Sequence, residues 1–141
     1  MSSTAIRLCL LDGQSERLVE GVQAVVAEDA SGQFGLHPGH EPMLTCLVAG
    51  VFKYRVGAEA QWRHGACSGG VLHGLNAADG VREVRIVSRR ILLGDDLPAL
   101  KEALKQALEE AAQAQSQAIT EVGGLDVAMQ RRLQELMESA P

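Results

Sequence analysis

The chain has 141 residues, of which 46% are apolar, 22% are charged and 3% are aromatic, and its formal net charge is −5. This composition is typical of one globular domain, or of one domain with a small appendage, and argues against a disordered chain. The acidic balance, the absence of a Lys/Arg cluster and the scarcity of aromatic side chains argue against nucleic acid as a partner.

Membrane insertion and secretion are not expected either. No segment approaches the roughly 20 continuous apolar residues that a spanning helix needs, and the N-terminus lacks the basic and apolar regions of a signal peptide. Cys9, Cys46 and Cys67 are odd in number and share no short spacing. We therefore expect free thiols in a reducing cytoplasm rather than a disulfide framework.

Up to about residue 90 the apolar residues recur with a period of two and are interrupted by glycine. Strands are predicted at residues 6–10, 22–29, 51–56, 60–64, 71–75 and 81–87, with a turn at Gly57 and a glycine pair at Gly69-Gly70. Many short strands separated by glycine turns predict an antiparallel β-sandwich or barrel, which we assign to residues 1–90.

Residues 32–45 are unusually rich in backbone-determining residues. They read Gly-Gln-Phe-Gly-Leu-His-Pro-Gly-His-Glu-Pro-Met-Leu-Thr. The glycines can adopt positive φ without a Cβ clash, whereas Pro38 and Pro42 fix φ and remove a donor. We expect a rigid loop with a Pro38-Gly39 turn, anchored by neighbouring apolar side chains and presented as a docking surface at a sheet edge.

From Asp95 onward the composition shifts to Ala, Leu, Glu, Gln and Lys. Asp95 and Asp96 are suitable N-caps, and leucines and alanines then recur every three or four residues. Gly123-Gly124 is expected to end this first helix, and Asp126 to cap a second, shorter one. The sequence thus predicts an antiparallel two-helix hairpin over residues 91–141, which we expect to be the least stable part of the molecule.

The pattern of residues 32–45 resembles the signature of the epsilon subunit of rotary F-type ATP synthases. That signature usually runs Gly-Glu-(apolar)-Gly-(apolar)-x-Pro-Gly-His-x-Pro-(apolar)-(apolar)-Thr, so that Gln33 stands where the family commonly has an acid. Residues 67–72 and the Gly94-Asp95-Asp96-Leu97 junction are also similar to the family. Arg89-Arg90 and this junction resemble the alternative, N-type branch more closely than the housekeeping branch.

The resemblance implies a non-catalytic subunit of the rotating central stalk, without a cofactor or metal of its own. Its partners would be the gamma subunit and the c-ring, at the cytoplasmic face of the bacterial inner membrane, where the chain would be peripheral. Gln33 matches the family position that faces the c-ring loop. The rest of the implied rotor interface is the loop at the same end, formed by His37, Pro38, Gly39, His40, Glu41 and Pro42.

The resemblance also bears on nucleotide binding and regulation. In many relatives the helical hairpin extends along gamma and restrains ATP hydrolysis, and some relatives bind ATP through an Ile/Leu-Asp-x-x-Arg-Ala motif at the start of the first helix. Here the matching positions hold Pro98, Lys101 and Glu102. Because lysine does not reproduce a bidentate guanidinium grip on phosphate, we expect ATP binding to be weak or absent.

Other readings of the sequence remain open. The sets His37, His40 and Cys46, and His64, Cys67 and His73, carry zinc-type ligands, although no strict zinc spacing. Ser68 is a hydroxyl nucleophile without a Gly-x-Ser-x-Gly elbow. The alternative function is a small β-sandwich enzyme or metal-binding domain with a helical tail, and a third is a self-associating helical adaptor. The coupling ion, H⁺ or Na⁺, and the resting position of the hairpin are not encoded in these patterns.

Overall fold

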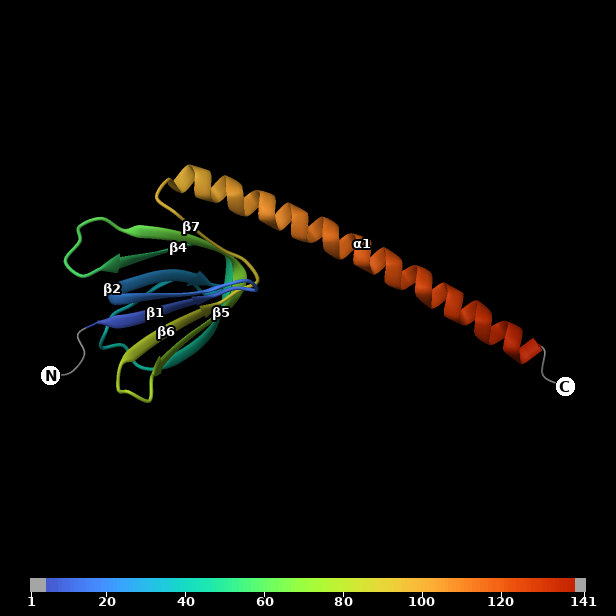
Figure 1. Ribbon diagram of the computed structural model, residues 1–141, viewed down its shortest axis with the longest axis horizontal. Coiled ribbons are helices and arrows are strands. Elements are labelled where there is room, and N and C mark those ends of the chain that lie inside the picture. The colour runs from blue at the N-terminus through green and yellow to red at the C-terminus, as the bar shows by residue number, and fades with distance from the viewer. Residues whose placement is uncertain (1–4, 139–141) are drawn as a thin grey trace. The chain divides into compact units, whose positions relative to one another are not determined.

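The computed structural model describes residues 5–138, with the side chains of 119–128 excluded. Seven strands precede one helix (Figure 1). Their bounds are β1 (Ile6–Leu11), β2 (Glu16–Asp29), β3 (Gly32–Leu36), β4 (Met43–Val56), β5 (Arg63–Asn76), β6 (Arg82–Val87), β7 (Ile91–Gly94) and α1 (Leu97–Glu138).

Five of the strands close into a barrel. The strand order is β1-β6-β5-β4-β2, and β1 pairs with β2 to complete the ring, while β3 adds to β2 and β7 adds to β5. The β-sandwich or barrel expected from the sequence is therefore confirmed. One pair departs from the antiparallel prediction, because β1 and β6 run parallel. Hydrophobic periodicity shows which face of a strand is buried but carries no information on strand direction.

The core follows the predicted alternation along each strand. Ile6, Leu8 and Leu10 of β1 are each at most 2% exposed, and they lie with the inward residues of the other strands. The largest fully buried side chains are Phe52, Ile6, Leu8, Leu10, Leu36, Leu72, Ile86, Val22 and Val25. Cys9 has outward parity but is also buried, because Glu83 lies against its thiol.

Several strands are longer than the sequence predicts. The strands expected at residues 60–64 and 71–75 belong to a single strand, β5, which begins at Arg63 and continues through Gly69-Gly70. Residues 32–36, expected in a loop, form β3 and pair with β2. Glycine lowers strand propensity without preventing pairing, so a glycine pair is a weak end signal.

The Gly69-Gly70 pair lies where β5 changes its partner strand. Residues 71–76 of β5 pair with β6, and residues 64–67 pair with β7. A Cβ at Gly70 would lie 2.0 Å from the Val87 carbonyl oxygen, and the φ of Gly70 is +145°. Both observations require glycine there. Ser68 fixes the same corner, with its Oγ 3.1 Å from Ser88 Oγ and its N–H donating to the Arg90 carbonyl.

The predicted two-helix hairpin is not what the structure shows, because residues 97–138 form one continuous helix. The predicted break at Gly123-Gly124 lies within it. A helical glycine costs about 1 kcal/mol relative to alanine but causes no clash, and strong helix formers flank the pair. The side chains of Ile119, Leu125 and the expected cap Asp126 fall outside the described residues.

The chain divides into two compact units, the first ending at Ala107 and the second comprising Leu108–Pro141. The expected boundary after residue 90 precedes β7, so the β structure extends four residues further. The first unit also holds the first turns of α1, where Leu100 and Leu104 are only 5% and 7% exposed. In the second unit the apolar residues Met129, Leu133, Leu136 and Met137 are exposed.

Candidate functional site

The turn at residues 37–42 connects β3 to β4 and is accessible. His37, Gly39, His40, Glu41 and Pro42 are exposed, and Pro38 is half-buried. The His40 N–H donates to the His37 carbonyl over 2.9 Å, which closes a turn with Pro38-Gly39 at its centre. His40 Nδ1 lies 2.6 Å from the Glu41 carbonyl oxygen. The predicted exposed turn is confirmed.

Of the three glycines that can adopt positive φ in this segment, only Gly32 does so. Gly32 has a φ of +118°, whereas Gly35 and Gly39 are not among the positive-φ glycines. Gly35 lies in the β2–β3 ladder opposite Val26. A Cβ at Gly39 would meet no atom within 4 Å. Proline at the second turn position already favours this geometry, so a left-handed residue is not required.

Gln33 does not lie beside this turn. It is exposed near the start of β3, opposite Glu28, and the turn follows the end of the same strand. Four strand residues span roughly 13 Å. The residues that the sequence predicted as one interface therefore lie at two separate places, at the start of β3 and after its end.

Gln33 lies at a groove of about 410 Å³ between the sheet and the start of α1. The groove also contains Lys53, His64 and Glu28 from the strands and Lys101 from α1. His64 Nδ1 is buried and has no hydrogen-bond partner among the described residues. At the matching position of the nucleotide-binding motif, this groove therefore has the single ammonium group of Lys101 in place of a guanidinium. The expectation of weak ATP binding stays a prediction.

Asp29 supports the start of β3, next to Gln33. Its carboxylate accepts a hydrogen bond from Thr45 Oγ1 over 2.8 Å and another from the Ser31 N–H over 2.9 Å. Bonds from the Ser31 and Thr45 hydroxyls are the main reason why the pKa of Asp29 is lowered from its ordinary value. These hydrogen bonds fix the β2–β3 hairpin beside Gln33.

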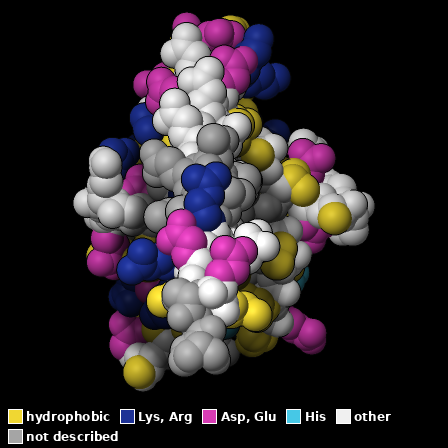
Figure 2. Space-filling view, turned by 90° about the vertical axis from the view of Figure 1, so that its right-hand side faces the viewer, with side chains coloured by type: hydrophobic (Ala, Val, Ile, Leu, Met, Phe, Trp, Pro, Cys, Tyr) yellow, Lys and Arg dark blue, Asp and Glu magenta, His cyan; other side chains and the backbone are white. Residues whose placement is uncertain are grey.

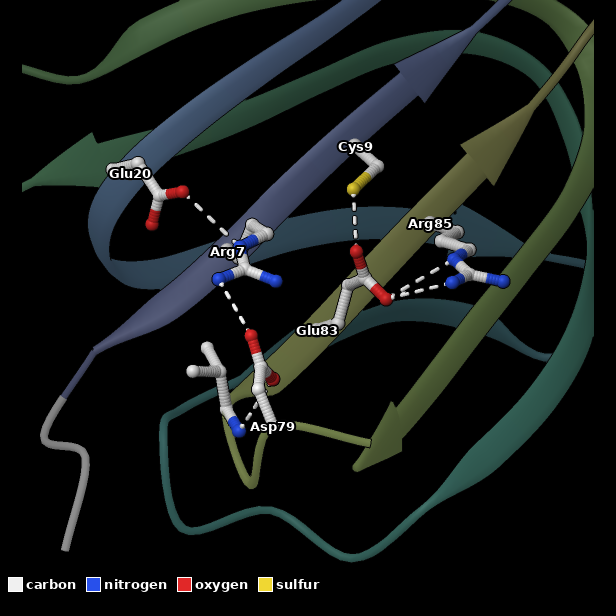
Figure 3. A network of polar contacts seen from close by, with 7 residues as sticks. Arg7, Cys9, Glu20, Asp79, Glu83 and Arg85 are labelled. Carbon is white, nitrogen blue, oxygen red and sulfur yellow. Dashed lines mark hydrogen bonds and ion pairs between the residues drawn. The ribbon is translucent and has the colours of Figure 1, made fainter. Parts of the chain in front are cut away.

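A polar network covers the outer face of β1 and β6 (Figure 3). Arg7 pairs with Glu20 and Asp79, each over 3.1 Å, and Arg85 pairs with Glu83 over 2.9 Å. These contacts join β1 to β2, and β1 to the loop before β6.

Glu83 also accepts a hydrogen bond from the Cys9 thiol, whose Sγ lies 2.8 Å from Glu83 Oε1 (Figure 3). Burial, followed by this hydrogen bond, raises the pKa of the Cys9 thiol to about 12. Since the thiolate is the nucleophilic form, Cys9 is suited to a structural role rather than to catalysis.

A further surface, which the sequence analysis missed, lies on the outer side of β4, β5 and β6. Cys46 pairs with Val71, and Val71 pairs with Val87, so these three side chains form one row across the sheet. Leu44 and Val48 flank Cys46 on β4, and Leu44 is 70% exposed. We call Leu44, Cys46, Val48, Val71 and Val87 the outer apolar patch. The apolar residues at alternate positions 44, 46 and 48 were its sequence signal.

The alternative sites considered from the sequence are not assembled. No group of three or more His, Cys, Asp or Glu side chains within the described residues is arranged to hold a metal ion. His37 and His40 lie on the turn, Cys46 lies in the patch and Cys67 is buried. The Ser68 hydroxyl contacts the Ser88 hydroxyl and accepts a hydrogen bond from the Arg90 N–H, and neither group can act as a general base.

A family model described as "ATP synthase, Delta/Epsilon chain, beta-sandwich domain" matches residues 6–77, just over half of the chain. The chain belongs to this family. The matched residues include all of β1 to β5, and with them both surfaces around β3 and most of the outer apolar patch. The resemblance drawn from residues 32–45 is thereby confirmed.

Curated relatives agree with the family assignment. ATP synthase epsilon chain 2 of Cereibacter sphaeroides is 44% identical over 82 residues, which cover 58% of this chain and 53% of the relative. ATP synthase epsilon chain 2 of Paraburkholderia xenovorans is 41% identical over 87 residues, or 60% and 59% of the two chains. This chain thus spans little more than half the length of these relatives.

Solved structures share the fold of this family member. A chain of the Euglena gracilis mitochondrial ATP synthase, in a structure of OSCP/F1/c-ring, has a TM-score of 0.56 and 23% identity, covering 80% of this chain and 67% of that one. A chain of the Tetrahymena thermophila mitochondrial ATP synthase central stalk and c-ring has a TM-score of 0.50 and 16% identity, with coverages of 81% and 98%.

On the face drawn in Figure 2, the Lys/Arg and Asp/Glu side chains shown in colour are interspersed rather than separated by sign. This pattern gives no continuous basic surface on that face, as nucleic-acid binding would need. Within residues 5–138, no helix combines the length and hydropathy required to cross a bilayer.

Proposed function

We propose that this chain is a non-catalytic rotor subunit of an ion-translocating F-type ATP synthase, joining the gamma subunit to the c-ring. The observation that carries the proposal is the family match over residues 6–77, which build four of the five barrel strands and most of the candidate docking surfaces. A rotor coupling needs two attachment surfaces on one stiff body. The closed barrel provides the stiffness, because each of its five strands is paired on both sides.

The outer apolar patch is our candidate for the gamma contact. Leu44, Val71 and Val87 are 70%, 38% and 49% exposed, respectively, and clustered exposed apolar side chains mark protein–protein contacts. The patch continues along the chain into the turn, since Leu44 follows Pro42 by two residues. The turn thus adds exposed polar side chains beside the apolar patch, and protein interfaces usually combine an apolar core with polar surroundings.

Gln33 and the adjacent β2–β3 hairpin are our candidate for the c-ring contact. They lie roughly 13 Å from the turn along β3, so one body can engage two partners without overlap. Gln33 is neutral where the family commonly has an acid, so its contact with the ring would be a neutral hydrogen bond rather than a charge-assisted one. The location that follows is the cytoplasmic face of the bacterial inner membrane, peripheral to the bilayer.

Substitution within the patch tests the gamma contact. Val71→Asp places a charge at the centre of the patch and should weaken binding to purified gamma by roughly 30-fold or more, about 2 kcal/mol, measured by isothermal titration calorimetry. Ala58→Asp introduces the same charge on the exposed β4–β5 turn and should leave the affinity unchanged. Equal affinities of the two variants would remove the patch from the gamma interface.

Disulfide trapping tests the ring contact. In a Cys46→Ser background, which removes the one exposed cysteine among those described, Gln33→Cys should form a disulfide with a cysteine introduced in the polar loop of the c subunit. Ala58→Cys should not. Trapping from residue 58 but not from residue 33 would contradict the assigned orientation.

A further inference from the structure

Arg82 is the first residue of β6, and it continues the inward-facing row of that strand. Val84 and Ile86 have the same parity and are buried, and the parallel partner of Arg82 is the buried Ile6. Because side chains alternate along a strand, Arg82 starts on the inner side of the barrel at its end. A long arginine stem lets the guanidinium leave an apolar interior and reach polar groups beyond it.

The group that Arg82 reaches is the turn at residues 37–42. Its Nη1 donates a hydrogen bond to the His40 carbonyl oxygen, which is 42 residues away in sequence. The two residues also enclose a cavity of about 20 Å³ with Ile6, Leu36 and Val84. The turn therefore covers the end of the barrel, and Arg82 connects it to β6.

The turn has little else to hold it in place. Among the described residues, its other hydrogen bonds are internal and join His37, His40 and Glu41 to one another. Pro38 and Pro42 have no N–H to donate. The bond from Arg82 is thus the one hydrogen bond that ties residues 37–42 to another element in the described part of the chain.

The guanidinium of Arg82 is also used differently from its neighbours. Arg7, Arg63 and Arg85 each pair with a carboxylate. Within the described residues no carboxylate forms an ion pair with Arg82, so its charge is directed at a backbone carbonyl. A hydrogen bond from a charged donor is roughly twice as strong as one between neutral groups.

We propose that Arg82 is the positioning residue of the turn: it fixes the His40 peptide and, through it, the orientation of the exposed His37, His40 and Glu41 side chains. The tie is a property of the isolated chain. That the turn is offered to the gamma subunit rests on the proposed function.

Amide hydrogen exchange of the purified full chain tests the tie directly. Arg82→Met keeps the apolar stem but cannot donate, so the His40 N–H should exchange roughly five- to ten-fold faster than in the wild type. Arg89→Met removes the same charge from an exposed position beyond the other end of β6 and should leave this rate unchanged. A wild-type rate in Arg82→Met, or equal acceleration by both variants, would overturn the proposal.

A second variant covers the case in which Arg82→Met does not fold. Arg82→Lys keeps a charged donor with a shorter reach. The exchange rate of its His40 N–H should therefore lie between those of the wild type and Arg82→Met. If Arg82→Met cannot be measured, the rate in Arg82→Lys should lie within a few-fold of the wild-type rate. Exchange of Arg82→Lys more than ten-fold above the wild-type rate would count against the tie.

Binding to gamma separates the tie from the proposed function. If Arg82→Met accelerates exchange of the His40 N–H and also weakens gamma binding several-fold, both the Arg82–His40 tie and the proposed gamma contact of the turn are supported. If exchange accelerates while the affinity stays at the wild-type value, the tie stands and the turn is removed from the gamma interface.

Discussion

At the residue scale, two glycines of this chain have opposite requirements, although both lie in sequence segments typical of the family. Gly70 is required by its φ of +145° and by the Val87 carbonyl oxygen, which would be 2.0 Å from a Cβ. Gly39 has neither constraint. The sequence indicated that residues 32–45 and 67–72 were special, but it could not rank their glycines, since the demand comes from a strand distant in sequence.

We therefore expect Gly70→Ala to destabilise the protein by about 3 kcal/mol or more, through backbone strain and overlap with Val87. Gly39→Ala should change the free energy of unfolding by less than about 1 kcal/mol. Urea titration followed by circular dichroism measures both. Similar losses at the two positions would show that the β5 corner is less tightly packed than described.

Cys9 gives a second residue-scale prediction, on pH. Its thiol pKa is raised from 9.0 to about 12 in the folded chain, so above pH 9 the unfolded thiol ionises while the folded one stays protonated. The stabilising contribution of the protonated thiol is complete below pH 9 and is lost as the pH rises toward 12. Cys9→Ala lacks this term, so its free energy of unfolding should fall less steeply from pH 8 to 10.5 than that of the wild type.

The exposed Cys46 provides the control for this experiment. Cys46→Ala makes the same chemical change on the surface and should preserve the alkaline loss of the wild type. Parallel pH profiles for Cys9→Ala and the wild type, measured by urea midpoints, would show that the Cys9–Glu83 contact does not set the alkaline stability.

At the element scale, periodicity predicted the strands well and their partners poorly. Alternation at residues 6–10 correctly identified the inward side chains of β1, because the apolar residues along a single strand indicate which of its faces is buried. The parallel pairing of β1 with β6 and the continuity of β5 depend on contacts between residues far apart. The single helix α1 shows the same limit, since Gly123-Gly124 lowers helix propensity without dictating a turn.

The first turns of α1 should matter for stability, and the rest of the helix should not. Leu100 and Leu104 are buried within the first unit, whereas residues 109–118 are exposed. Truncation after Ala107 should leave the free energy of unfolding of the β unit within about 1 kcal/mol of the full chain. Truncation after Gly94 removes both leucines and should cost about 2–4 kcal/mol.

Chemical denaturation of the two truncated chains measures this difference. An equal loss in both would show that residues 108–141 contribute to the stability of the β unit. In the reassembled ATPase, unchanged hydrolysis after removal of residues 108–141 would leave the helix without the regulatory role that the family resemblance implies.

At the scale of the whole molecule, the length of β3 separates Gln33 from the turn at residues 37–42, which the sequence analysis had placed together. The motif at residues 32–45 was recognisable because prolines and glycines leave a distinct pattern. Gln33 and the turn belong to that one motif, yet Gln33 lies near the start of β3 and the turn follows its end. The outer apolar patch could not be read as a unit, because its five residues come from three strands that meet only in the fold.

If this chain joins the gamma subunit to the c-ring through its barrel, as proposed, it should bind gamma in solution. Size-exclusion chromatography of the full chain mixed with purified gamma tests it most directly. We expect one co-eluting species at a one-to-one ratio, which Val71→Asp dissociates and Ala58→Asp does not. Separate elution of the two wild-type proteins at micromolar concentration would contradict it.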